Sequence, residues 1–235
     1  MPSPKPLYGM FTVIPPRYDL INRLITLGLD KGWRLQAAQA CLASRPPKVL
    51  DLCCGTGDLA INIATLADYS IEIKGLDYSQ PMLDLAAKKA SLLKGKTISF
   101  AQGDASKLPF AGGDFDCIGI SFAFRNLTFN NILAKEHLSE IIRVLKPGGR
   151  CVIVESSQPR SSFVRDCYHF YLRQYVYRVG AGLSGNKPAY RYLVESASHY
   201  YSPDELKQLL LNAGFAGVSY RPLFFGAAGI YVAYT

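Results

Sequence analysis

The residues best suited to hold a ligand are two glycines in the stretch 53–57, which reads Cys-Cys-Gly-Thr-Gly. An apolar run that contains Asp51 precedes them, and a segment of helical character follows. This order predicts a strand, a tight turn and a helix N-terminus. Gly55 and Gly57 permit backbone angles that other residues resist, and the free N–H groups of a new helix favour an anionic or carboxylate-bearing ligand.

Polar residues also end the apolar stretches that follow this turn along the chain. Strands and helices alternate from residue 48 to residue 156, which predicts a mostly parallel sheet with helices on both faces. Ligands of such sheets bind beyond the carboxyl ends of the strands, where these polar side chains would converge on a site. The residues at or near the ends, with their stretches, are Asp77 (71–77), Asp104 (97–104), Ser121 (116–122) and Glu155 (150–155).

Two ligands compete for the glycine turn. The pattern Gly55-x-Gly57-x-x-Ala60, with Asp77 further on, fits the dinucleotide fingerprint. Asp51 favours S-adenosylmethionine instead, because its carboxylate can orient the loop and reach the cationic methionine end through water. No second acid or basic pocket is placed for a pyrophosphate.

For S-adenosylmethionine, an acceptor-only side chain at the end of the second strand suits the two ribose hydroxyls. The acid of Asp104 can accept from the adenine amine, and the Ala105 N–H can donate to a ring nitrogen. We therefore predict that the cofactor is bound by Asp51, Gly55, Thr56, Gly57, Asp77, Tyr78, Asp104, Ala105 and Ser121.

Length and composition predict one α/β domain over residues 1–235. Its sheet is expected to be doubly wound, mostly parallel and seven-stranded. We expect an N-terminal helical cap at 7–44, a cofactor-binding core at 48–156, an inserted helical lid at 157–201, and a closing helix with two strands at 202–235. A helix is predicted from about residue 130 to 145, and Lys146–Gly149 is predicted to be a hard stop before the fifth strand.

The charge balance and the cysteines limit the partners. A net charge of +8 permits nucleic acid, an anionic membrane or an acidic substrate, but the Lys and Arg residues are not packed into blocks. The six cysteines form no C-x-x-C pair and no Cys/His cluster, which predicts a reduced, cytoplasmic protein without a metal. No apolar run is long enough for a transmembrane helix, and the N-terminus lacks a signal core.

Tyrosines, phenylalanines and arginines alternate through the predicted lid. Such side chains could hold an aromatic substrate, lie on a membrane surface, stack on single-stranded nucleic acid, or pack into a small core of their own. Residues 180–188 are predicted to be a flexible break.

Four motifs together resemble those of class I S-adenosylmethionine-dependent methyltransferases. They are Val49–Gly57, Gly75–Asp77, Gly103–Ala105 and Leu145–Gly149. More narrowly, the chain resembles the C-methyltransferases of ubiquinone and menaquinone biosynthesis, of the demethylmenaquinone methyltransferase type. The residues that carry this resemblance cover nearly the whole chain: Tyr18-Asp19-x-x-Asn22 with Thr26, Gly28 and Trp33, the segment Ser121–Asn126, Arg143–Gly149 through Ser157, Tyr190–Ser196, and Ala213–Phe215.

The resemblance implies methylation of a ring carbon on a reduced, prenylated quinone. It also implies a lipophilic quinol as partner. The lid's aromatic residues and the positive charge predict a protein that associates peripherally with the inner face of the membrane, and the lack of dense Lys/Arg runs argues against nucleic acid. A homodimer is one compatible state. The chain departs from the family at Asp30, where a histidine is usual, and at Ala123-Phe124, where Gly-Leu is usual. We expect the larger Phe124 ring near the acceptor pocket, so the acceptor is a demethylmenaquinol-like quinol, a related quinol or another lipophilic aromatic compound.

Arg125 and Asn126 are the first candidates for the acceptor chemistry, because they follow the fourth strand. Arginine is a poor general base, so Arg125 is expected to stabilise a phenolate-like oxygen, and Asn126 to bind an acceptor oxygen. Tyr18 is expected to close the pocket or relay a proton. The alternative role for Arg125 is a salt bridge to Asp19 or Asp104.

Other roles remain open at this point. His169 and His199 are candidate bases in the lid, and His137 is expected on the surface of a helix. The alternatives for the whole chain are a methyltransferase for another small molecule and a non-catalytic module that binds S-adenosylmethionine or nucleic acid. The intact glycine turn with Asp77 argues against the inactive module.

Overall fold

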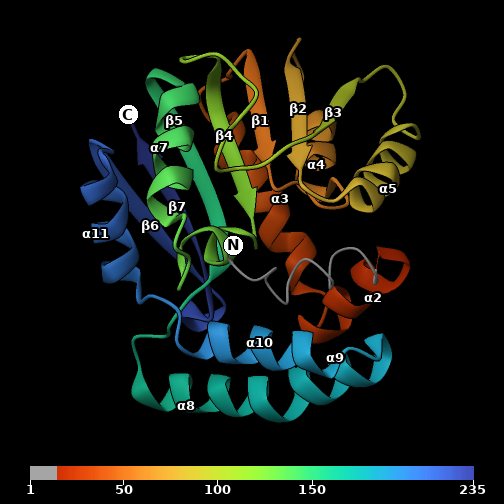
Figure 1. The fold of residues 1–235 in the computed structure, drawn as a ribbon, viewed down its shortest axis with the longest axis vertical. Helices are drawn as coiled ribbons and strands as arrows, with labels where there is room; N and C mark the ends of the chain where they lie inside the picture. The colour runs from red at the N-terminus through yellow and green to blue at the C-terminus, as the bar shows by residue number, and fades with distance from the viewer. Residues whose placement is uncertain (1–14) are drawn as a thin grey trace.

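A computed structural model describes the backbone of residues 15–235 and the side chains from Tyr18 onward. These residues form a seven-stranded sheet in the order β3-β2-β1-β4-β5-β7-β6 (Figure 1). The strands are β1 (Lys48–Leu52), β2 (Glu72–Asp77), β3 (Ile98–Gln102), β4 (Phe115–Ser121), β5 (Leu145–Ser156), β6 (Gly217–Leu223) and β7 (Ala228–Tyr234). The first five run parallel, and β7 lies antiparallel between β5 and β6. The predicted fold class is therefore confirmed.

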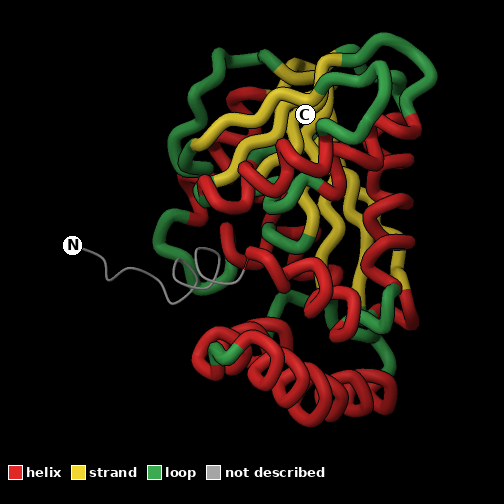
Figure 2. Tube along the Cα trace, turned by 90° about the vertical axis from the view of Figure 1, so that its right-hand side faces the viewer, coloured by secondary structure: helices red, strands yellow, loops and turns green. Residues whose placement is uncertain are grey.

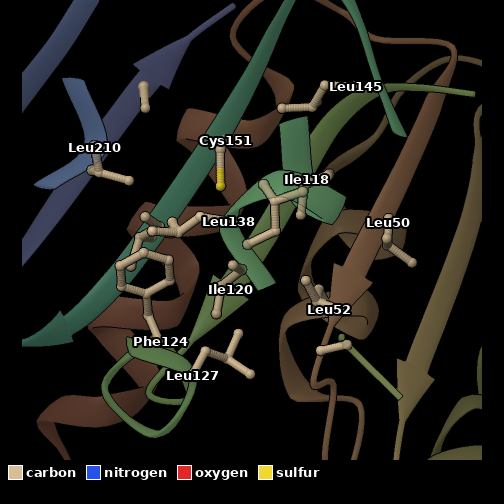
Figure 3. Close-up of a cluster of buried hydrophobic side chains, with 14 of the residues drawn as sticks. Leu50, Leu52, Ile118, Ile120, Phe124, Leu127, Leu138, Leu145, Cys151 and Leu210 are labelled. Atoms are coloured by element: carbon tan, nitrogen blue, oxygen red, sulfur yellow. The ribbon is translucent and has the colours of Figure 1, made fainter. Parts of the chain in front are cut away.

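Helices cover both faces of the sheet. One face packs on α3 (Leu29–Leu42) and α4 (Asp58–Leu66) through a buried cluster that includes Ala37, Val49 and Ile63. The other face packs on α7 (Ala134–Val144) and α11 (Pro203–Ala213), and Figure 3 shows Leu138 and Leu210 of that cluster beside the strands. The helix α5 (Gln80–Ala90) connects β2 to β3, and the short α6 (Phe124–Thr128) follows β4.

The turn after β1 has the predicted form of strand, turn and helix. Cys53, Gly55 and Gly57 all have left-handed backbone angles, and α4 begins directly after Gly57. A side chain at position 57 would be both strained and crowded, because its Cβ would lie 3.0 Å from the Ala86 Cβ. Glycine has no Cβ, so it avoids both the backbone strain and the contact with Ala86.

Two predicted boundaries are wrong. The helix predicted from residue 130 begins at Ala134, after a turn in which Asn130 has a left-handed φ of 49°. Residues 146–149 do not precede the fifth strand but lie inside β5, as an irregularity between the pairs Phe115↔Leu145 and Cys117↔Arg150. The Thr235 N–H donates to the Gly149 carbonyl, so the chain terminus holds this irregular segment in the sheet.

The cap and the lid lie beyond the carboxyl ends of the parallel strands, and Figure 2 shows the lid as a separate layer of helices. The described part of the cap consists of α2 (Pro15–Ile25) and α3, and residues 7–14 of the predicted cap lie outside the described residues. The lid consists of α8 (Ser162–Tyr171), η1 (Leu172–Val176), α9 (Tyr177–Ser184) and α10 (Lys187–Ser198). Ile21 and Ile25 of α2 pack into the same buried cluster as Tyr190 of α10. Some of the lid's aromatic side chains therefore form a small hydrophobic core together with residues of the cap.

A break between two lid helices lies inside the predicted range 180–188, but it is shorter than predicted and covers only Gly185 and Asn186. The helix α9 continues to Ser184, and the chain turns only at Gly185, where φ is 70°. Gly180 instead allows close packing, because a Cβ there would lie 2.0 Å from the Tyr190 ring. Gln158 also joins the beginning of the lid to its last helix, because its side chain donates to the Ala197 carbonyl of α10 at 2.8 Å.

Among the described residues, no helix is both long and apolar enough to cross a lipid bilayer.

Candidate active site

A cavity of about 430 Å³ lies between the cap, the lid and the carboxyl ends of β4 and β5. Most of its lining is apolar or aromatic, with walls from α2 and α3 on one side and from α8, η1 and α10 on the other. Its polar lining includes Tyr18, Arg125, Asn126, Glu155 and Ser156. Such a mostly apolar cavity with a few convergent polar groups is typical of a small-molecule site.

Arg125 and Glu155 form the centre of the polar lining. Glu155 is 0% exposed, and its carboxylate accepts hydrogen bonds from the Arg125 N–H at 3.0 Å and from the Ser156 N–H at 2.8 Å. The Arg125 Nη1 lies 3.7 Å from Glu155 Oε1 and donates to Ser156 Oγ at 2.6 Å. The ion-pair partner of Arg125 is therefore Glu155, and the alternative of Asp19 or Asp104 is wrong.

Two buried polar atoms next to this pair have no hydrogen-bond partner among the described residues. They are the Arg125 Nε and the Asn126 Oδ1, and both residues line the cavity. A buried donor or acceptor without a partner costs free energy. One free donor and one free acceptor at the same end of a cavity suit a ligand that carries polar oxygens. Ser121 Oγ at the end of β4 is also buried without a partner in the described chain, but it does not line the cavity.

Tyr18 reaches the cavity from α2. Burial raises the pKa of its phenol, while a hydrogen bond from the Asn22 side chain and the charge of Arg34 act in the opposite direction. The phenol is therefore protonated near neutral pH and can donate a hydrogen bond.

The glycine turn and the ends of β2 and β3 form a neighbouring edge. The Gly55 N–H donates to Asp77 Oδ2 at 2.8 Å, and the Ser79 N–H donates to Asp77 Oδ1 at 2.9 Å. Burial raises the pKa of the Asp77 carboxyl. Tyr78 beside it is exposed, and the Gly103 N–H donates to the Asp77 carbonyl, which brings Asp104 and Ala105 to the same edge.

Asp51 lies beneath this turn and is completely buried. Its Oδ2 accepts from the Ala60 N–H of α4 at 2.9 Å, and its Oδ1 has no partner in the described part of the chain. Burial raises the pKa of Asp51 to about 8. The side chain joins β1 to α4 and does not line the cavity.

Charged side chains hold the cap on the glycine turn. The Thr56 hydroxyl donates to Asp19 Oδ1 at 2.7 Å, and the Lys89 ammonium lies 3.0 Å from Asp19 Oδ2 and contacts Asp58. Asp19 comes from α2, Asp58 from the start of α4, and Lys89 from the end of α5. Sequence patterns do not indicate this network, because the residues that bond one another in it are 31 to 70 positions apart.

Asp30 is part of a second ion pair at the cavity. Its carboxylate accepts from the Thr26 hydroxyl at 2.9 Å and contacts the Arg34 guanidinium, which also lies 3.8 Å from Asp58. Both Asp30 and Arg34 line the cavity. The Asp30 carboxylate is therefore paired and lies in the wall of the cavity.

Several other expectations are wrong or find no support in the geometry. Phe124, the first residue of α6, is fully buried in the core and does not line the cavity. His137 is also buried, with its Nδ1 2.8 Å from the Leu127 carbonyl, rather than on the surface. His169 contacts Gln158 and His199 contacts the Glu195 carbonyl, and neither histidine lines the cavity.

A model of the ubiE/COQ5 methyltransferase family matches residues 4–235. A demethylmenaquinone methyltransferase of Deinococcus radiodurans is 43% identical over 95% of this chain and 90% of its own length. The enzyme of the same name from Thermus thermophilus is 41% identical over 95% and 98%. A ubiquinone/menaquinone biosynthesis C-methyltransferase, UbiE, of Geobacter sulfurreducens is 39% identical over 94% and 85%.

Solved structures show the same fold at low sequence identity. An S-adenosylmethionine-dependent methyltransferase from Aquifex aeolicus is 19% identical with a TM-score of 0.54, covering 80% of each chain. A phosphoethanolamine N-methyltransferase of Haemonchus contortus, solved with S-adenosylhomocysteine, is 14% identical with a TM-score of 0.58, covering 85% of this chain and 52% of its own.

The buried Asp51 carboxyl predicts a pH dependence of stability. Its pKa is about 8 in the folded chain and about 4 in an unfolded one, so between these values the folded state binds the extra proton. Its contribution to the free energy of unfolding is fully present below about pH 4 and is lost as the pH rises through about 8. The loss is at most about 1.4 kcal/mol per pH unit.

Asp51→Asn removes this proton and keeps the acceptor for the Ala60 N–H. In urea unfolding between about pH 5 and pH 8 without cofactor, we expect the wild type to lose stability relative to the variant as the pH rises. A difference that stays constant with pH would show that Asp51 is already ionised in the fold.

Proposed function

Because this chain belongs to the ubiE/COQ5 methyltransferase family, we propose that the quinol it methylates is a demethylmenaquinol, a prenylated naphthoquinol with one unsubstituted ring carbon. The chain is an S-adenosylmethionine-dependent C-methyltransferase of quinone biosynthesis. The preference for a naphthoquinol is supported by the relatives at 43%, 41% and 40% identity, which carry the name demethylmenaquinone methyltransferase.

The observation that carries the proposal is the cavity itself, whose polar end holds a free donor and a free acceptor beneath apolar walls. A quinol has the same two-part character, with ring oxygens at one end and an apolar tail at the other. The Arg125 Nε can donate to one ring oxygen, and the Asn126 Oδ1 can accept from a quinol hydroxyl.

S-adenosylmethionine supplies an activated methyl group when bound. The residues at the turn fit it, because a Cβ at Gly55 would meet nothing within 4 Å and the space above the turn is therefore open. We assign the ribose hydroxyls to Asp77 and the adenine to Asp104 and Ala105, with Thr56, Gly57, Tyr78 and Ser121 around them. Asp51 acts from beneath, by fixing the start of α4 against β1.

The chemistry requires electron density on the ring carbon that receives the methyl group. Loss of a proton from the neighbouring quinol oxygen supplies that density, and Arg125 stabilises the resulting negative charge. After the methyl group has been transferred, the proton of the methylated carbon must be lost and the oxygen reprotonated to restore the aromatic quinol, with a net release of one proton to water. The ion pair with Glu155 and the hydrogen bond to Ser156 Oγ hold the guanidinium in place, so its direction is fixed before the acceptor arrives. Tyr18 closes the cavity beside the turn and can relay the proton through its phenol. All these residues belong to one chain, so the proposal does not require a homodimer.

The proposed function predicts that only the reduced acceptor is methylated. An oxidised quinone carbonyl withdraws electrons from the ring and has no hydroxyl proton to lose. With S-adenosylmethionine labelled in the methyl group, label should enter the organic phase with a reduced, prenylated naphthoquinone and not with its oxidised form. Transfer to other phenols but to no quinol of a benzoquinone and naphthoquinone panel would contradict the proposal.

Replacement of Arg125 should separate turnover from cofactor binding. Arg125→Lys keeps the positive charge near Glu155 but loses the Nε donor, so we expect kcat to fall by about 100-fold. Affinity for S-adenosylmethionine, measured by calorimetry, should stay within about twofold. The lysine is preferred to alanine because a buried Glu155 without a cation would cost about 3–5 kcal/mol of stability.

Arg221→Lys is a matched control, since Arg221 is exposed and bonds Gln36 outside the cavity. Full turnover by Arg125→Lys would rule out the proposed role of the Arg125 Nε.

We also propose that the protein associates peripherally with anionic membranes through the lid. Phe163 and Phe170 are exposed on α8 seven residues apart, which places them on the same helix face. Apolar side chains on an exposed face, together with the net charge of +8, suit an anionic lipid surface.

The wild type should therefore sediment with anionic vesicles at low salt, and a Phe163→Ser/Phe170→Ser variant should sediment less. Leu92→Ser serves as the control, because Leu92 is equally exposed but follows α5. A wild type that stays in the supernatant at low salt would contradict this part of the proposal.

A further inference from the structure

Strained backbone is concentrated around the cavity. Seven non-glycine residues of the described chain have positive φ, and four of them line this one cavity: Leu27, Phe122, Phe224 and Phe225. Large side chains rarely adopt such angles, and they do so where surrounding structure enforces them, most often at functional sites. The concentration of strain marks this wall of the cavity as more than a packing surface.

The strained residues differ in their exposure. Leu27, in the turn between α2 and α3, is 61% exposed, and Phe224 and Phe225, in the η2 turn (Phe224–Gly226) between β6 and β7, are 52% and 80% exposed. Cys167 of α8 is also exposed and lines the cavity. These four residues are therefore the exposed part of the cavity lining, and we call the part formed by Phe224 and Phe225 the mouth; Arg125 and Glu155 of the same lining are buried.

A row of aromatic rings connects the mouth to the polar lining. The ring of Phe225 lies 5.5 Å from that of Phe224, which lies 6.4 Å from Trp33, which in turn lies 5.9 Å from Phe122. Phe122 is three residues before Arg125. The Cζ atom of the Arg34 guanidinium lies over the Phe122 ring, 5.4 Å from the ring centroid. The row therefore begins in solvent at Phe225 and ends beside the polar lining.

We propose that this row of rings is the channel for the apolar tail of the acceptor, and that the tail leaves the protein at the mouth over Phe224 and Phe225. The inference rests on the proposed function, because it places the acceptor ring at Arg125 and Asn126. A polyunsaturated hydrocarbon tail gains hydrophobic contact along such a wall, and it covers apolar surface that is otherwise exposed to water.

Continuity with the polar end favours a substrate tail over a lipid surface as the occupant of the mouth. The exposed rings of the mouth and the buried donor of Arg125 line one uninterrupted cavity. The outer face of α8, with Phe163 and Phe170, is separate, since neither residue lines that cavity.

The test compares naphthoquinols with and without a prenyl tail as acceptors. Phe225→Asn removes the ring at the mouth while keeping a residue that tolerates the left-handed backbone. We expect the ratio of kcat/KM for the tailed acceptor to that for the tail-less acceptor to fall by about 10-fold. Phe225→Leu should restore most of the ratio, and Leu92→Ser should leave it at the wild-type value.

A binding measurement without turnover uses Cys167, the exposed one of the six cysteines. A polarity-sensitive fluorophore on this thiol should shift to the blue when the oxidised, tailed naphthoquinone is added without S-adenosylmethionine. The tail-less compound should cause a much smaller shift, and Phe225→Asn should reduce the response to the tailed compound.

The outcomes separate the channel from the proposed function. Methyl transfer to quinols with an unchanged tail preference in Phe225→Asn would overturn the channel and leave the function intact. If Phe225→Asn keeps the wild-type preference for the tailed acceptor but sediments less with vesicles, the channel is overturned and the mouth is a membrane contact instead. A blue shift that depends on the tail and on Phe225, in a protein that methylates no quinol, would support the channel and contradict the function.

Discussion

The buried carboxylate of Glu155 is the constraint on which the candidate site depends. A carboxylate with no exposure to water must be compensated by donors and a cation, and here those come from Arg125 and Ser156. The compensation fixes the end of β5, the start of α6 and the guanidinium together. The guanidinium is fixed in this way, and Glu155 does not contact the Arg125 Nε. This strong donor therefore has no hydrogen-bond partner among the residues that the structure describes. Stability of the fold and readiness for a ligand therefore come from the same pair.

A second set of charges joins the cap to the cofactor edge. Asp19 of α2 binds the Thr56 hydroxyl in the middle of the glycine turn, and Lys89 neutralises it together with Asp58. The Asp30–Arg34 pair extends this network toward the cavity and reaches Asp58. The cap is thus not simply packed on the edge of the sheet, because polar contacts tie it to the residues that we assign to the cofactor.

Local patterns predicted the features that local forces determine. The strand, turn and helix around Gly55 and Gly57 follow from apolar alternation and backbone freedom within a dozen residues. Features that depend on distant partners were missed: the Arg125–Glu155 pair spans 30 residues, and the irregular segment of β5 is held by Thr235. Gly180 suggested a flexible break because its packing partner, the Tyr190 ring, is visible only after the lid has folded. The mouth at Phe224 and Phe225 was not predicted from the sequence, because a strained turn between two strands has no distinctive sequence pattern.

The lid departs from the sheet immediately after the residues that hold Arg125. Ser156 ends β5, and Gln158 two residues later already bonds both His169 and the Ala197 carbonyl within the lid. The residues that hold the guanidinium and the residues that begin the lid are consequently neighbours on one short piece of backbone. The sheet holds this piece on one side, because Ser156 pairs with Ala228 of β7 and the Ser157 N–H donates to the Ala227 carbonyl. A ligand that enters between the side chains of the mouth leaves these contacts in place.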